Sequence, residues 1–443
     1  MTAIVFVVLL VGGITGAVQK AEDALPALIE KARAAEKSDN LHEAARAYEQ
    51  ILQIRPHWGA VEFNLGLVYF SQKRYSDAVR LYTQALQDNP SLVEAYLSLG
   101  IAYYHSSHYA EALSSLKRFL DLRPMDQEAH LALAATYYAL GDYGKAALEY
   151  VAQMRISPNQ SSVYYYLSKT YRALAVEALK ELESQKAFPE RKAALEADFN
   201  KELQECRQLQ HVAKGPPAVA CLVDQGDFST ATSVLAAAQS HTPHDPRTEY
   251  VCLRLYSVMA EQAFAKLAAL SPDSYFVAML RATTLQRERK YADADREYEL
   301  AGRLVGDDPD VFIEHGKLKD AMGRFREAIP LFQKALALDP ANPRVRSLLG
   351  EAYWMSGQPE AALPLLQEVV RSNPNDVQSR IYAAEAWDSL HDIDDAIRTL
   401  EEAPSDNDGR IHFLLAKYYN RQGKKEDAAR ALEYFHQHQQ EKR

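Results

Sequence analysis

The sequence predicts an all-α fold, a solenoid of stacked helical hairpins, and three features of its 443 residues carry this prediction. Prolines recur 34 residues apart, an alanine stands twelve residues before each of them, and a bulky side chain stands eight residues before. A unit repeated at one fixed period is typical of proteins that stack copies of that unit. The chain length suits either such an array or two to three compact domains.

Six copies of this pattern align without gaps. The prolines are Pro56, Pro90, Pro124, Pro158, Pro340 and Pro374; the alanines are Ala44, Ala78, Ala112, Ala146, Ala328 and Ala362; the bulky residues are Tyr48, Tyr82, Leu116, Tyr150, Phe332 and Leu366. Four units also share a small residue after a leucine, with a tyrosine three residues further on: Leu65-Gly66 and Tyr69, Leu99-Gly100 and Tyr103, Leu133-Ala134 and Tyr137, and Leu349-Gly350 and Tyr353.

Each position that recurs from unit to unit has a physical role in a helical hairpin. Leu99 and Tyr103 are four residues apart and share one helical face. A small residue at Gly100 or Ala112 lets two helices approach closely. The proline ends each second helix because it cannot continue the hydrogen-bond ladder.

This pattern resembles the tetratricopeptide repeat, a 34-residue helix-turn-helix unit. The resemblance implies an α-solenoid, a right-handed superhelix of about eleven such units, several of them degenerate, with a long concave groove. Because such folds bind along extended surfaces, the expected partner is a protein or a peptide.

The repeats are uneven along the chain, which divides it into segments. We expect an N-terminal array over 19–171, an elongated helical hairpin over 172–217 that projects from the stack, degenerate units over 218–308 and a C-terminal array over 309–443. The fifth unit opens with Tyr164, Leu167 and Tyr171 but fails to close. The stretches 226–243 and 260–272 resemble second helices of weakened units.

Residues 1–18 contain an unbroken uncharged run, AIVFVVLLVGGITGAV, that ends in small residues. Its sixteen residues fall short of the roughly 20 that a membrane-spanning helix needs. The run predicts a signal peptide cleaved after Ala17, and hence export to a periplasmic or extracellular compartment. The alternatives are an uncleaved anchor that attaches the chain to a membrane and an ordinary buried helix.

By the resemblance, the first helix of each unit faces the groove, and its inward positions form the candidate binding surface. These positions are Phe63, Leu67 and Phe70, then Leu97, Ile101 and Tyr104, then Leu131 and Tyr138 beside Ala135, and finally Tyr165, Lys169 and Arg172. The matching stripes after residue 309 are far more polar. Packing within a tight superhelix would bury the same side chains, so the sequence leaves both a binding and a packing role open.

The sequence carries no motif of a nucleic-acid-binding, metal-binding, nucleotide-binding or catalytic site. The net charge is −10 with no basic stripe, which argues against nucleic-acid binding. Cys206, Cys221 and Cys252 lack the pairing of a zinc module and leave open one disulfide or three buried apolar side chains. No phosphate-binding loop, dinucleotide motif or H-E-x-x-H appears. We therefore expect no catalytic residues, metal, cofactor or small-molecule substrate.

These observations favour a non-enzymatic scaffold that binds a peptide or helical segment in its groove. A setting in the assembly of an envelope or secretion complex is the accompanying hypothesis. The alternative function is an accessory or substrate-presenting subunit of an enzyme complex.

Overall fold

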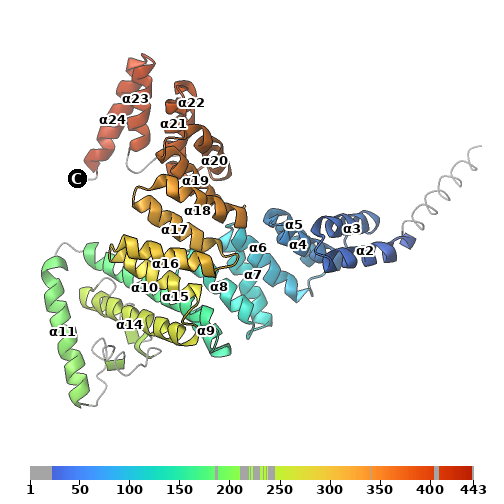
Figure 1. Cartoon of the computed structure of the whole chain (residues 1–443), viewed down its shortest axis with the longest axis horizontal. Helices are drawn as coiled ribbons and strands as arrows, with labels where there is room; N and C mark the ends of the chain where they lie inside the picture. Colours follow the sequence, from blue (N-terminus) through green and yellow to red (C-terminus); the bar gives the residue numbers. More distant parts are fainter. Residues whose placement is uncertain are drawn as a thin grey trace, which may run out of the picture. The chain divides into compact units, whose positions relative to one another are not determined.

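The computed structural model describes residues 22–184, 188–209, 219, 221–222, 230–232, 234–235, 237, 245–340, 342–403 and 409–441. The regular secondary structure of these described residues is α-helical, as the sequence predicts. The chain divides into two compact units, Met1–Leu280 and Arg281–Arg443, and in each most of the described helices follow one another through short turns (Figure 1).

The helices follow one another in pairs along most of the chain. The first unit contains α2 (Leu25–Lys37), α3 (Leu41–Ile54), α4 (Gly59–Ser71), α5 (Tyr75–Asp88), α6 (Val93–His105), α7 (Tyr109–Leu122), α8 (Gln127–Ala139), α9 (Tyr143–Ile156), α10 (Ser161–Ser184), α11 (Phe188–Leu209) and α14 (Pro246–Leu270). Helix α15 (Tyr275–Arg287) spans the boundary. The second unit contains α16 (Tyr291–Leu304), α17 (Pro309–Ala321), α18 (Phe325–Leu338), α19 (Pro343–Met355), α20 (Pro359–Ser372), α21 (Val377–Ser389), α22 (Ile393–Glu401), α23 (Arg410–Arg421) and α24 (Lys425–Glu441).

The predicted proline boundaries are confirmed. The residue before each proline leaves the helical conformation, with φ −130° and ψ 84° at Arg55 and φ −144° and ψ 87° at Asn89. A proline excludes the residue before it from the α region, so each second helix ends one residue earlier. The next first helix then begins three residues after the proline, at Gly59 and at Val93.

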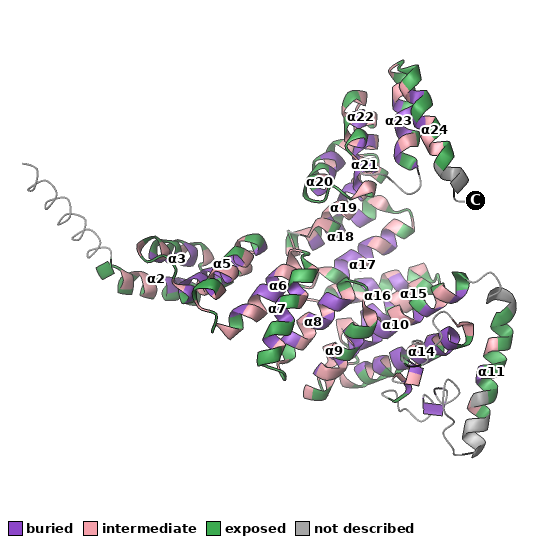
Figure 2. Cartoon of the chain, turned by 180° about the vertical axis from the view of Figure 1, so that it is seen from behind, coloured by how far each residue is buried: buried purple, intermediate pink, exposed green. Residues whose placement is uncertain are grey.

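The predicted core positions are also confirmed. All six alanines twelve residues before the prolines are fully buried. A Cβ atom on Gly66 would lie 2.5 Å from the ring of Tyr82, and one on Gly100 would lie 2.6 Å from Leu116. The bulky residue of the second helix therefore packs directly against the small residue of the first. Buried positions gather where successive helices meet (Figure 2).

The fifth unit differs from the prediction. Helix α10 runs without interruption from Ser161 to Ser184. It packs along the length of α14, which is far away in sequence, and it touches α11 over a small area. Figure 1 shows α10 and α14 alongside each other. The part of segment 172–217 that lies in α10, residues 172–184, therefore contributes to the core, since Ala175, Ala178 and Leu182 are buried. Residues 260–270 are the second half of α14 rather than a separate helix.

The insertion thus separates the two helices of one hairpin instead of following a closed unit. Helix α10 ends at Ser184, and α11 begins at Phe188, directly before Pro189. The uncharged run at 1–18 lies outside the described residues. None of the helices in the described part of the chain combines the length and apolar character needed to cross a membrane.

Candidate functional site

The candidate stripe lies on α4, α6, α8 and the first half of α10, as the register predicts. Phe63, Phe70, Leu97, Ile101, Tyr104, Leu131 and Tyr138 are half-buried. Leu67 is more open, with 39% of its surface exposed. Phe63 also packs on Tyr82 of its own unit, with ring centroids 5.6 Å apart. The stripe is therefore partly packed and partly accessible along three consecutive units.

Each of these three units has an aromatic pair at the turn between its first and second helix. The ring centroids of Phe70 and Tyr75 lie 5.2 Å apart, those of Tyr104 and Tyr109 lie 5.8 Å apart, and those of Tyr138 and Tyr143 lie 4.9 Å apart. In each pair, the last ring of the stripe meets the first residue of the second helix. Such edge and tilted contacts hold aromatic rings in one orientation.

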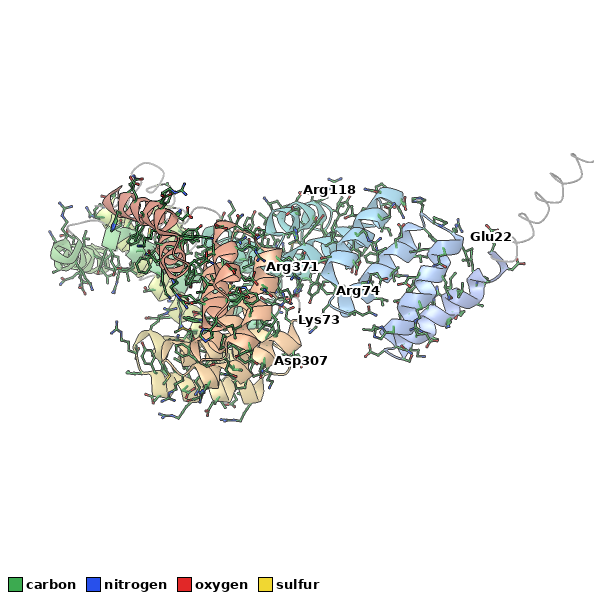
Figure 3. All side chains as sticks on the ribbon, turned by 90° about the horizontal axis from the view of Figure 1, so that it is seen from above. Glu22, Lys73, Arg74, Arg118, Asp307 and Arg371 are labelled. Atoms are coloured by element: carbon green, nitrogen blue, oxygen red, sulfur yellow. The ribbon has the colours of Figure 1, made fainter. Side chains whose placement is uncertain are left out.

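The turn inside each unit brings these rings together. Lys73 and Ser107 adopt left-handed conformations with φ of 60° and 63°, and Gly141 takes φ 79° at the equivalent place. This residue reverses the chain within a few positions, so that residues five apart meet. Figure 3 marks the first such turn at Lys73 and Arg74. The Arg74 guanidinium lies 3.8 Å from the ring centroid of Tyr69 and extends the aromatic layer.

His105 joins two neighbouring units. Its ring stacks on Tyr75 at 4.9 Å, meets Phe70 edge-on at 5.6 Å and contacts Tyr104 at 5.4 Å. The aromatic stripe is therefore continuous between the units that carry Phe70 and Tyr104. From the sequence, the available signal for this role was the position of His105, one residue past the stripe.

The last part of the predicted stripe is engaged within the chain. Tyr165 is buried and its ring lies 4.9 Å from that of Phe276. The Arg172 guanidinium donates to the carbonyl oxygen of Leu280 at 3.2 Å. Lys169 places its ammonium 5.3 Å from the ring centroid of Tyr138. For Tyr165 and Arg172 the packing role therefore describes the structure, because α14 and α15 cover this end.

Tyr150 of α9 belongs to the core cluster against which Leu97, Ile101, Leu131 and Tyr138 pack. Burial, reinforced by nearby Tyr166 and Tyr104, raises the pKa of Tyr150 well above its ordinary value. The phenol therefore stays neutral at physiological pH, and its ring stacks on Tyr166 at 5.4 Å. A neutral aromatic floor with half-exposed rings above it suits apolar anchors of a bound chain.

The second unit has a different surface at the equivalent positions. Ile313 and Ile381 are buried, so these two take part in packing. Lys317 pairs with Glu314 at 2.6 Å, and Asp388 pairs with Lys417 at 3.0 Å. These positions are therefore polar, as the sequence predicts, and several of their charged side chains form ion pairs.

The cysteines resolve one open alternative. Cys221 is disulfide-bonded, and Cys252 is a buried thiol. Burial, and then the charge of Glu249, raise the pKa of Cys252, which keeps its sulfur in the unreactive protonated form.

Family models match four stretches of the chain. A model described as "Tetratricopeptide repeat" matches residues 321–387 and 354–418, and another of that description matches residues 97–161. A model described as "TPR repeat" matches residues 66–107. The matches lie over the regular hairpins of both units, including α6, α8 and their partners.

One curated relative and several solved structures are similar to parts of the chain. The aspartyl/asparaginyl beta-hydroxylase of Mus musculus is 25% identical over 186 residues, which are 38% of this chain. The chain spans about a quarter of that relative, since the match covers 25% of it. A tetratricopeptide repeat protein from Parabacteroides merdae is 16% identical with a TM-score of 0.45, covering 74% of this chain and 99% of that chain. The MamA protein is 22% identical with a TM-score of 0.34, covering 39% of this chain and 96% of that chain.

The family models match sequence that the structure folds into hairpins of 13- and 14-residue helices, repeated every 34 residues. Together these findings identify the chain as a tetratricopeptide-repeat protein.

Proposed function

We propose that the N-terminal array is a protein-interaction scaffold whose aromatic stripe binds a peptide or a helical segment of a partner. The observation that carries this proposal is the repeated pair of a half-buried stripe ring and the ring that opens the next helix. Phe70, Tyr104 and Tyr138 occupy this place in three successive units. A row of rings at regular intervals matches a partner that carries apolar anchors at regular intervals.

Energetics support a contact centred on these rings. Each ring is already oriented by its neighbour, so binding would cost little side-chain entropy. The area that stays exposed would gain about 25 cal/mol for each Å² of apolar surface that a partner covers. Oriented aromatic side chains of this kind dominate the affinity of many protein interfaces.

Site-specific crosslinking tests the position of the partner. A photoreactive phenylalanine analogue is placed at Tyr104, or as a control at Leu148, which is 64% exposed on the second helix α9. We expect the Tyr104 probe to link one recurrent partner segment with apolar residues at regular spacing, identified by mass spectrometry. Equal crosslinking of that segment from Leu148 would contradict the proposed site.

A second candidate function is substrate presentation within an enzyme complex. The match to the mouse aspartyl/asparaginyl beta-hydroxylase supports it, because a quarter of that enzyme is similar to part of this chain. In this case the segment crosslinked at Tyr104 would be modified by an enzyme that copurifies with the scaffold. An unmodified segment would favour a purely architectural role.

We further propose that the protein is exported, with membrane attachment through its N-terminal run as the alternative. The disulfide at Cys221 supports an oxidising compartment, where such bonds persist. The remaining cysteine besides Cys252 is Cys206. We expect non-reducing peptide mapping to find a Cys206–Cys221 crosslink in protein from its native compartment. N-terminal sequencing after cell fractionation separates a mature chain beginning at Val18 from an uncleaved anchor.

A further inference from the structure

A cluster of three ionisable side chains lies where the first regular hairpin opens, apart from the stripe. His57 precedes α4, Glu62 lies in the first turn of α4, and Asp88 is the last residue of α5. The His57 Nδ1 atom lies 3.2 Å from the Asp88 Oδ2 atom. One imidazole nitrogen or carboxylate oxygen from each of the three lies within 4.8 Å of the others.

Glu62 departs from the role that its position has in other units. In four other units, the side chain six residues after the proline lies against the carbonyl of that proline: the Tyr164 hydroxyl donates to Pro158 at 2.8 Å, His130 Nε2 lies 3.0 Å from Pro124, Arg346 donates to Pro340 at 2.6 Å and Arg380 donates to Pro374 at 3.2 Å. An ionised Glu62 has no proton to donate. Its carboxyl group lies at Asp88 instead.

The Glu62 carboxyl group is buried with an unsatisfied oxygen. Only 5% of the residue is exposed, and its Oε2 atom is buried without a hydrogen-bond partner. An orphaned buried carboxylate oxygen is costly unless a proton or a cation occupies the position that it faces.

The backbone is shaped to bring these groups together. A Cβ atom on Gly59 would lie 2.9 Å from the carbonyl oxygen of Ala85 and 3.1 Å from the Cβ atom of Asn89. Glycine therefore lets the start of α4 lie directly against the end of α5. This close approach holds Glu62 beside Asp88, although both side chains carry acidic groups.

We propose that His57, Glu62 and Asp88 bind a divalent transition-metal ion, with Zn²⁺ the ion that their donor set fits best. Zinc takes imidazole nitrogen and carboxylate oxygen at about 2.0–2.2 Å. Tetrahedral geometry then separates two ligand atoms by about 3.3 Å. The His57 and Asp88 atoms already lie 3.2 Å apart, and all three ligand atoms lie within 4.8 Å of one another, so small side-chain shifts would complete the geometry when the ion binds. Solvent completes the shell, because 73% of the His57 side chain is exposed.

The bound ion would join the beginning of α4 to the end of α5. It would neutralise the two carboxylates and give the Glu62 Oε2 atom its missing partner. Metal binding would therefore stabilise the first regular hairpin of the array, independently of any ligand in the groove.

Zinc titration of the full chain tests the site. The untagged protein is stripped with a chelator, dialysed, and titrated calorimetrically with zinc chloride at pH 7.5, with thermal melting followed in parallel. We expect zinc to raise the melting temperature, and His57→Asn, Glu62→Gln and Asp88→Asn each to lower zinc affinity by about tenfold or more. Because His57 is exposed and asparagine tolerates its left-handed φ of 60°, that variant keeps the fold.

A second histidine–carboxylate pair provides the matched control. His130 Nδ1 lies 2.6 Å from Glu149 Oε2, so Glu149→Gln removes a similar pair elsewhere in the array. We expect this variant to bind zinc as the wild type does. Zinc affinity and melting unchanged in all three cluster variants would overturn the proposal. A second pair of results would also overturn it: zinc leaves the melting temperature of the wild type unchanged, and Glu62→Gln is more stable than the wild type. In that case a proton, and not a metal ion, satisfies the buried oxygen.

Discussion

The Ser168 hydroxyl donates a hydrogen bond of 2.9 Å to the carbonyl oxygen of Ala260, 92 residues later in the chain. Both ends of the bond are buried, and the same helix pair stacks Tyr171 on Tyr256. These contacts join α10 to α14 as the two halves of one hairpin. The array therefore continues across the insertion instead of ending before it.

Removal of this hydroxyl should weaken the closure of the fifth hairpin. We expect Ser168→Ala to lower the free energy of unfolding by about 1 kcal/mol, the usual net worth of one hydrogen bond. Chemical denaturation followed by circular dichroism measures the change. Ser184→Ala is the control, because its hydroxyl donates to the Glu181 carbonyl oxygen within its own helix at an exposed position. Equal effects of both variants would mean that the contact with Ala260 contributes nothing.

Alanine substitutions at Gly100 in α6 and at Gly144 in α9 should change stability in opposite directions. A Cβ atom at Gly100 would enter the space of Leu116, so Gly100→Ala should destabilise the array by about 1–3 kcal/mol. At Gly144 the added atom would meet only an Asp142 oxygen at 4.0 Å. There the better helix propensity of alanine should stabilise α9 by up to about 1 kcal/mol. Thermal melting of the two variants decides, and a stabilised Gly100→Ala would contradict the close approach of α6 and α7.

A partly buried ion network in the second unit makes stability depend on pH. Asp295 accepts from Lys319 at 2.8 Å and faces His315 Nε2 at 2.6 Å, and Lys319 also donates to Glu327 at 2.9 Å. Burial opposes ionisation of Asp295, but the hydrogen bonds and charges of Lys319 and His315 outweigh it and lower the pKa of the carboxyl group. An unfolded aspartate has a pKa of about 3.9.

The stabilisation from Asp295 should therefore be complete above about pH 4 and disappear as the pH falls through the lower pKa of the folded state. We expect Asp295→Asn to cost about 1.5–3 kcal/mol at pH 7 and less in acid. Urea unfolding followed by Trp354 and Trp387 fluorescence in a Trp58→Phe background reports on this unit. Asp293→Asn, at an exposed pair with Arg296, should change little. A penalty that grows in acid would contradict the network.

Local rules explain why most of the fold was predictable. The extended residue before each proline, the fully buried alanine and the glycine facing a bulky side chain all arise within one 34-residue unit. The partner of α10 was not predictable, because no local signal shows that a helix will pair with one about 80 residues away. The long helix-forming run after a unit that does not close made residues 172–217 look like a separate hairpin.

The candidate site shows the same division. The register places Phe70, Tyr104 and Tyr138 on one stripe, and the structure keeps them half-buried there. The sequence did not show that Tyr165 would be covered by Phe276, since that contact depends on α15 following α14. The sequence also did not show the cluster of His57, Glu62 and Asp88, because Asp88 lies 26 and 31 residues after the other two. An acidic residue at a position where other units carry donors was the available signal.

The most direct test of the central claim measures affinity and stability together. The partner segment recovered by crosslinking is synthesised, and its affinity is measured for the wild type, for the triple variant Phe70→Ser, Tyr104→Ser and Tyr138→Ser, and for the control Leu148→Ser. We predict that the triple variant loses at least about 100-fold in affinity, or about 2.7 kcal/mol, while its helicity and melting temperature stay near wild type and the control binds normally. Retained affinity in the triple variant, or collapse of its stability, would contradict a binding role for the stripe.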